Sequence, residues 1–211
     1  MGGRQRHDAL HRAGTGRRRR GALAGGGAMS IDTTTLEGVV ELREPTLTAL
    51  VTAVTHSGGM TAIAVVTAAL TVLMLRAGRR DDALLLSATI LTGWPLMSLL
   101  KLQFGRERPP QPERLIDLTT HSFPSGHAMM TAMLATVLAA VIARRSPPRS
   151  HRALVAYCAL GAYTLAVGLS RVYLAAHWLT DVVAGWVLGS LWALLWVGLI
   201  TRVRARLSPR P

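Results

Sequence analysis

The sequence is poor in the residues that build disulfide-linked domains and nucleic-acid grooves. Cys158 is its single cysteine, so the chain has no internal disulfide and no cysteine zinc cluster. Aromatic residues make up 5% of the 211 positions, and they do not alternate with basic residues as in grooves that bind single-stranded nucleic acid. Asp and Glu together number 11, which excludes a disordered acidic protein.

Charged residues are also scarce, at 17% of the chain, while 50% of the residues are hydrophobic. Soluble domains of this size usually carry more charge and fewer aliphatic residues. The formal net charge of +13 suggests nucleic-acid binding at first sight. Nearly half of this charge, however, lies in residues 1–29, a glycine- and arginine-rich stretch that we expect to be a disordered leader. We therefore expect no specific nucleic-acid partner, with salt-dependent DNA binding by the leader as the alternative.

Long apolar stretches occupy most of the remaining chain. Their polar residues are mostly Thr, Ser and Gly, which membrane helices accept at their interfaces, and no polar face recurs with the helical period. Each stretch is near the ~20 residues that a bilayer requires. The pattern predicts an all-α, integral-membrane helical bundle of about five spans plus an interfacial N-terminal helix. The expected spans are residues 60–75, 83–102, 126–143, 153–169 and 177–200.

The segment before the first span is more polar. Leu47, Leu50, Val51 and Val54 have the spacing of an amphipathic helix, which should end at the glycines 58–59. It is too short and too polar to span. We expect four regions: a leader at 1–29, an amphipathic interfacial segment at 30–58, a membrane core at 59–201, and a basic cytoplasmic tail at 202–211.

Arginine clusters predict the orientation of the spans. Clusters follow the first, third and fifth spans, at 76–80, 144–152 and 202–210, and would mark the cytoplasmic side. The segments 103–125 and 170–176 then face the other side. Lys101, which is the only lysine, Arg108 and Arg171 also fall on that side and break the rule. Cations that break the rule at a membrane surface call for a functional explanation.

Three cations without nearby acids repel one another unless an anion lies between them. Phosphate is the natural anion, because guanidinium groups match its oxygens. Ser125 and Gly126 stand where the third span begins, where free backbone N–H groups also bind anions. Lys101, Arg108, Arg171, Ser125 and Gly126 therefore predict a phosphate site. Arg106, in the same loop as Arg108, is expected to be a solvated loop residue.

Two histidines and one acid complete this site. His127 lies in the first turn of the third span and His177 at the start of the fifth. Asp181 follows His177 by four residues and shares its helix face. A carboxylate so placed can accept one ring N–H and leave the other ring nitrogen as a nucleophile. No carboxylate cluster suited to Mg²⁺ accompanies these residues, so we expect no metal and no other cofactor.

The three segments form recognisable motifs: K-x6-RP at 101–109, PSGH at 124–127 and SR-x5-H-x3-D at 170–181. Together they resemble the signature of the type-2 phosphatidic acid phosphatase superfamily, and the resemblance covers roughly residues 45–200. It implies a membrane-bound, metal-independent phosphatase core that hydrolyses a phosphate monoester or diphosphate on a lipid. The candidate substrates are phosphatidic acid, phosphatidylglycerophosphate and undecaprenyl diphosphate.

The resemblance also implies a role for each motif residue. His177 would attack phosphorus and form a phosphohistidine, with Asp181 orienting it. His127 would protonate the leaving lipid oxygen and then activate water. Phosphate-binding residues would neutralise or hydrogen-bond the phosphate oxygens as charge shifts in the transition state. These phosphate-binding residues are Lys101, Arg108, Ser125, Gly126 and Arg171.

Several alternatives stay open at this stage. The chain could be a non-catalytic lipid-binding or transport protein that retains the phosphate site, or a vanadate-dependent oxidase like the related haloperoxidases. Many family members have six spans, so either a first span is missing or translation starts at Met29. The expected location is the inner membrane, multi-pass, with the site on the extracytoplasmic side. The oligomeric state is left open.

Overall fold

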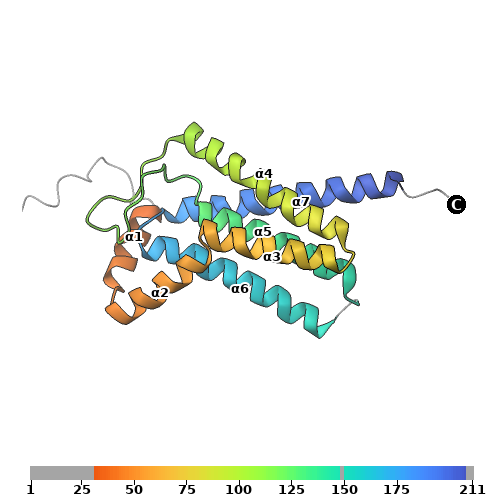
Figure 1. The fold of residues 1–211 in the computed structure, drawn as a ribbon. Coiled ribbons are helices and arrows are strands. Elements are labelled where there is room, and N and C mark those ends of the chain that lie inside the picture. The colour runs from red at the N-terminus through yellow and green to blue at the C-terminus, as the bar shows by residue number, and fades with distance from the viewer. Residues whose placement is uncertain (1–30, 148–149, 208–211) are drawn as a thin grey trace, which may run out of the picture. The chain divides into compact units, whose positions relative to one another are not determined.

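The computed structural model describes residues 31–147 and 150–207, which form seven α-helices and no strand (Figure 1). This confirms the predicted all-α class. The expected leader at 1–29 lies outside the described residues, as do the last residues of the expected tail. The helices are α1 (Ile31–Glu41), α2 (Pro45–Ser57), α3 (Met60–Arg76), α4 (Arg80–Phe104), α5 (Gly126–Arg145), α6 (His151–Tyr173) and α7 (Leu179–Leu207).

Four of these helices, α4 to α7, are long and apolar enough to cross a membrane. A fifth span forms only if α2 and α3, which bend by 46° at the break between them, count as one. The described part of the chain is therefore a multi-pass membrane bundle, as predicted. The first expected span coincides with α3, but α3 has 17 residues and reaches spanning length only with α2. The separate helix α1 has no counterpart among the predicted elements.

Capping residues explain where several helices begin and end. The side chain of Glu44 accepts a hydrogen bond from the Leu47 N–H at 3.0 Å, and Pro45 occupies the first turn of α2. Ser150 caps α6 in the same way. Gly105 ends α4 in the left-handed conformation, with φ of 56°. This turn sends the chain from the end of α4 into the loop that carries Arg108.

The helix α4 runs without a break through Gly93 and Pro95. Membrane helices tolerate proline because neighbouring groups satisfy the freed backbone. Gly93 lies in close contact with α5, since a side chain there would meet the sulfur of Met133 and the methionine would have to shift. The continuous α4 delivers Lys101 to the end of the bundle where α5 begins.

The helix α5 packs against α3, α4, α6 and α7, and it is the most buried of the spanning helices. Two glycines on α7 allow the closest of these approaches. A methyl group on Gly185 would lie 2.8 Å from the carbonyl oxygen of Ser125, and one on Gly189 would meet the backbone of Met129. This small-residue pair lets the two backbones touch, as in other membrane helix pairs. The start of α7 is thereby held against the start of α5.

The arginine clusters predicted to face the cytoplasm meet at the other end of the bundle. Asp82, which is 2% exposed, accepts Arg145 at 2.5 Å and Arg79 at 3.1 Å, with Arg144 at 3.8 Å. Asp81, next to Asp82 in the chain, forms an ion pair with Arg204 near the end of α7. The three clusters therefore share one end of the bundle, and the three motifs share the opposite end (Figure 1).

Candidate active site

The three motifs come together where α4 and α6 end and where α5 and α7 begin. A cavity of about 570 Å³ lies there, within the range typical of small-molecule sites. Ser125 and Asp181 do not line it but are fully buried, and the Ser125 N–H donates to the Asp181 carbonyl oxygen at 3.0 Å. The other predicted site residues all line this cavity: Lys101, Arg108, Gly126, His127, Arg171 and His177.

His177 lies in the turn between α6 and α7, two residues before α7 begins, whereas we expected it at the start of the fifth span. The chain leaves α6 through Ala175, which has a φ of 50°, and the His177 N–H donates to the carbonyl oxygen of Arg171 at 3.2 Å. This tight turn aims the imidazole back into the bundle, where it is 4% exposed. The histidine is therefore fixed by a turn rather than by a helix.

The contacts of the His177 ring determine its tautomer. Its Nε2 lies 3.2 Å from Nη1 of Arg108, and a guanidinium can only donate, so Nε2 carries the lone pair. Its Nδ1 lies 3.4 Å from Oγ of Ser122 and 3.6 Å from Oδ2 of Asp181. Burial, together with nearby cations and against the effect of Asp181, lowers the pKa of His177 to about 3. The ring is neutral, and its Nε2 faces the guanidinium of Arg108 at the cavity.

Asp181 is further from His177 than a direct hydrogen bond requires, and Ser122 explains the gap. The Ser122 hydroxyl donates to Oδ2 of Asp181 at 2.5 Å, and its oxygen stands next to Nδ1 of His177. The N–H of Trp178 also donates to Oδ2, at 3.1 Å. Sequence reasoning missed Ser122, because a serine in a loop rich in Ser and Thr gives no signal of its own.

Two of the buried donors that have no hydrogen-bond partner among the described residues belong to the predicted site. They are Oγ of Ser125 and Nε of Arg171, whose residues are 0% and 2% exposed. Another nitrogen of the Arg171 guanidinium does have a partner, since Nη1 donates to Oγ1 of Thr55 at 2.7 Å. Buried polar groups normally find partners, so an unpartnered donor pair beside a cationic cavity indicates an anion site. Thr55, at the end of α2, was not predicted.

Lys101 and Arg108 also tie together the loop that carries the second motif. The Lys101 ammonium donates to the carbonyl oxygens of His121 and Pro124, both at 2.8 Å. Nε of Arg108 donates to the carbonyl oxygen of Thr120 at 2.7 Å. Both cations face the cavity while shaping its wall, so they combine a structural contact with a place beside the predicted phosphate.

Arg106 is not the solvated loop residue that we expected. Its guanidinium donates to Oδ1 of Asp181 at 2.5 Å and to Oδ2 of Asp32 at 2.7 Å. The residue lies over the ring of Trp178, with its central carbon 5.8 Å from the ring centroid. The error has a physical reason, because Asp32 is 74 residues away and local patterns carry no information on that contact.

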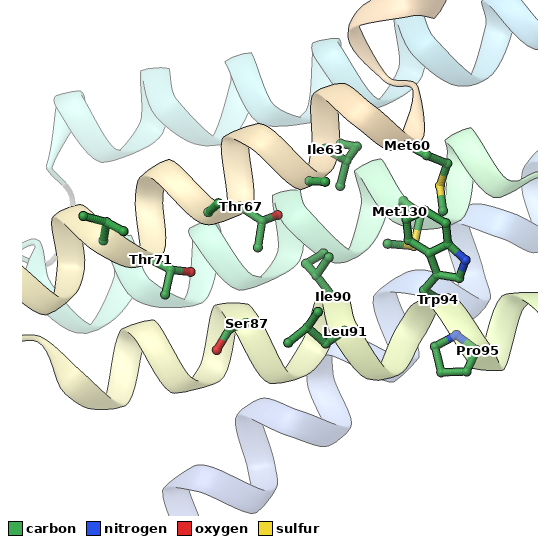
Figure 2. Close-up of a pocket in the computed structure, with 13 residues that line it drawn as sticks. Met60, Ile63, Thr67, Thr71, Ser87, Ile90, Leu91, Trp94, Pro95 and Met130 are labelled. Carbon is green, nitrogen blue, oxygen red and sulfur yellow. The ribbon is translucent and has the colours of Figure 1, made fainter.

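An apolar groove adjoins the site between α3 and α4 (Figure 2). Its volume is about 510 Å³, and it runs along α3 past Thr67 and Thr71. Met60 and Trp94 line both this groove and the cationic cavity, so the two spaces meet at these side chains. The candidate site therefore joins a cationic cavity to an apolar groove that runs along the helices of the membrane bundle.

Comparison with known proteins agrees with this geometry. Residues 82–205 match the PAP2 superfamily. Phosphatidylglycerophosphatase B of Bacillus subtilis is 30% identical over 175 residues, which cover 83% of this chain and 86% of that protein. The crystal structure of a transmembrane PAP2-type phosphatidylglycerolphosphate phosphatase from Bacillus subtilis aligns with a TM-score of 0.75 and 30% identity, covering 82% of this chain and 85% of that one. Aquifex aeolicus LpxE shares the fold, with a TM-score of 0.66, 22% identity and coverage of 80% and 96%. This chain belongs to the PAP2 superfamily.

Proposed function

We propose that this protein is a lipid phosphate phosphatase that releases phosphate from a phosphate monoester or diphosphate of a membrane lipid. Phosphatidylglycerophosphate is the leading substrate, because the Bacillus subtilis relative is named for that activity. The observation that carries the proposal is the junction at Met60 and Trp94, where a cavity rich in cations meets an apolar groove. A lipid phosphate needs both spaces: cations for its headgroup and an apolar surface for its chains.

The first chemical step would use the lone pair of His177 Nε2. This nitrogen attacks phosphorus, the bond between phosphorus and the lipid oxygen breaks, and His127 gives a proton to that oxygen. Arg171 and Ser125 hydrogen-bond the phosphate oxygens through their unpartnered donors as negative charge shifts onto the leaving group. Asp181 faces the ring side that carries the Nδ1 proton and stabilises the charge that develops there.

The second step would hydrolyse the phosphohistidine. His127 takes a proton from water, the water oxygen bonds to phosphorus, and the nitrogen–phosphorus bond breaks. Inorganic phosphate leaves, and Nε2 of His177 regains its lone pair. The cations Lys101, Arg108 and Arg171 supply positive charge around the phosphate, so we propose that the reaction proceeds without an added metal.

The site would face the extracytoplasmic side of the inner membrane. The arginine clusters at the opposite end of the bundle support this orientation, because such clusters mark cytoplasmic ends. A lipid phosphate would then reach the cavity from the outer leaflet, sliding along the groove between α3 and α4.

Phosphate release from purified protein tests the proposed function. We expect turnover of phosphatidylglycerophosphate, phosphatidic acid or undecaprenyl diphosphate in detergent micelles containing a chelator. A panel of the three, assayed side by side, ranks the substrates. Absence of phosphate release from all three, with or without divalent metal, would reject the proposal. Activity that requires metal would reject the metal-free mechanism alone.

Filling the groove should separate lipid substrates from soluble ones. Ala68 lines the groove, and Ala68→Phe would occupy space that a lipid chain needs. We expect kcat/KM for a long-chain lipid phosphate to fall about tenfold, because apolar chain contacts are lost, while hydrolysis of a short soluble phosphate monoester stays unchanged. The two substrates are assayed on the same preparation.

Val66→Phe provides the matched control. Val66 lies two residues away on α3, is exposed, and does not line the groove, so the same ring added there should leave both rates unchanged. Equal losses on both substrates in Ala68→Phe would argue that the groove does not hold the lipid chain.

A further inference from the structure

A chain of charged residues links α1 to the buried acid of the third motif. Arg106 donates from Nη1 to Oδ1 of Asp181 at 2.5 Å and from Nη2 to Oδ2 of Asp32 at 2.7 Å. Asp181 is 0% exposed and Asp32 is 7% exposed. The three motifs assign no role to Arg106 or Asp32. Because both carboxylates are buried and bind the same guanidinium, these hydrogen bonds fix the orientation of Arg106 relative to Asp181 and Asp32.

Asp32 also holds the first turn of α7. Its Oδ1 accepts the backbone N–H of Thr180 at 2.9 Å, and its Oδ2 accepts the Thr180 hydroxyl at 2.6 Å. Burial alone would raise the pKa of Asp32, but hydrogen bonds from Thr180 and Arg106 and the charge of Arg106 lower it. An ionised carboxylate at this place caps α7 from another helix. Its negative charge also interacts favourably with the positive N-terminal end of the α7 dipole.

The two oxygens of Asp181 have separate partners. Arg106 binds Oδ1, whereas Ser122 and the ring of His177 lie on the side of Oδ2. Arg106 therefore does not compete with the histidine for the same oxygen. It prevents rotation of the carboxylate and so fixes the oxygen that faces Nδ1 of His177. Partners of this kind orient a reactive group without touching the substrate.

We propose that Arg106 and Asp32 are positioning residues, which act through Asp181 to hold the His177 ring in line with the phosphorus that it attacks. This inference rests on the proposed function of the same site and deepens it. Neither Arg106 nor Asp32 lines the cavity, and their charged groups are bound to Asp181, to Thr180 and to each other, so neither is placed to bind the substrate itself. The helix α1, outside the matched family region, thereby becomes part of the machinery that sets the reaction rate.

The inference predicts a loss of rate without a loss of binding. In the full-length protein in detergent, Arg106→Gln should lower kcat about 100-fold, since small misplacements of a reacting group cost that much. KM should change by no more than about threefold. Asp32→Asn should lower kcat about tenfold, and Arg106→Lys should recover part of the Arg106→Gln loss because one charged contact to Asp181 remains.

Anion binding provides a readout that needs no turnover. Orthovanadate can bond to Nε2 of His177 in a geometry that resembles the transition state. Inorganic phosphate binds only to the cationic side chains. By calorimetry, Arg106→Gln should weaken orthovanadate binding about tenfold and inorganic phosphate binding by less than about twofold. The unequal effect on the two affinities separates a displaced His177 ring from a weakened affinity of the cations for the anion.

Arg43→Gln is the matched structural control. Arg43 is a half-buried arginine that ties the N-terminal helices to the carbonyl oxygen of Tyr173, at 2.8 Å, without contacting Asp181. It should change the melting temperature but not kcat or the ratio of orthovanadate to phosphate affinity. If Arg106→Gln does not fold, Asp32→Asn and Arg106→Lys carry the same comparison.

The outcomes separate the two proposals. A wild-type protein that binds both anions but releases no phosphate from any lipid would reject the proposed function, while the orthovanadate ratio would still test the positioning role. A raised KM with unchanged kcat, an unchanged orthovanadate ratio, or the same losses in Arg43→Gln would overturn the positioning role. A wild type that binds neither anion would overturn both.

Discussion

Replacing His177 with alanine is expected to lower phosphate release at least ~10⁴-fold, because nucleophile replacements in enzymes with a covalent intermediate cost this much. The ring turns its Nε2 lone pair toward the cavity, where it accepts from Nη1 of Arg108 at 3.2 Å, and burial with nearby cations lowers the pKa of His177 to about 3, so that the ring is neutral near pH 7. No other side chain lining the cavity offers a neutral nitrogen in the same place with a carboxylate behind it. Release of inorganic phosphate from a lipid phosphate in micelles measures the loss.

A label on the protein identifies the step that is lost. Wild-type protein mixed briefly with radiolabelled substrate should carry a label that is stable in base and lost in acid, as expected of a phosphohistidine. His177→Ala should carry none, while His151→Ala, at the opposite end of α6, should behave as wild type. Labelling that persists in His177→Ala would assign the nucleophile to another residue, with His127 the first to examine.

Replacing Arg171 is expected to produce the second largest loss of activity. Removing its charge should also raise the stability of the protein. Arg171→Lys should lower kcat/KM about 100- to 1,000-fold, the usual cost of one transition-state donor. A lysine ammonium cannot both hold Thr55 and supply the second donor that we propose the Arg171 guanidinium gives to phosphate. Arg171→Met should lose the same activity but melt at a higher temperature, because a buried cation that pairs with no carboxylate of the described residues is costly.

Phosphate should reverse the stability difference. Inorganic phosphate binds the folded protein and should raise the melting temperature of the wild type, but not of Arg171→Met. Thr55→Val is the control, since it removes the contact that holds Nη1 while leaving the charge in place. If Arg171→Met lowers the melting temperature and phosphate stabilises both proteins equally, Arg171 serves the fold and not the anion.

Much of the bundle could be predicted because its signals are local. Apolar stretches of spanning length predicted α4 to α7, and the spacing of Leu47, Leu50, Val51 and Val54 predicted the helix α2. The motif spacings predicted which residues would lie near one another, and six of the eight named residues line one cavity. Helix periodicity and capping depend on neighbours within a few residues, so the sequence carries this information directly.

The contacts that hold the site could not be predicted in the same way. Ser122 reaches Asp181 across 59 positions, and Thr55 reaches Arg171 across 116. Asp32 reaches Thr180 across 148 positions. A serine, a threonine or an aspartate in a polar segment is compatible with many environments, so only the packing of α1, α2 and α7 shows which partners they have.

By itself, the sequence determined the membrane class of this protein, the approximate helix bounds, and the set of cations, histidines and acid that its motifs carry. Only the tertiary structure decided how these groups are held: the turn that aims His177, the unpartnered donors of Arg171 and Ser125, and the groove that meets the cavity at Met60 and Trp94. The reason is physical. Hydrophobicity and capping act between near neighbours in the chain, whereas the orientation of a buried charge depends on partners that folding alone brings within hydrogen-bond distance.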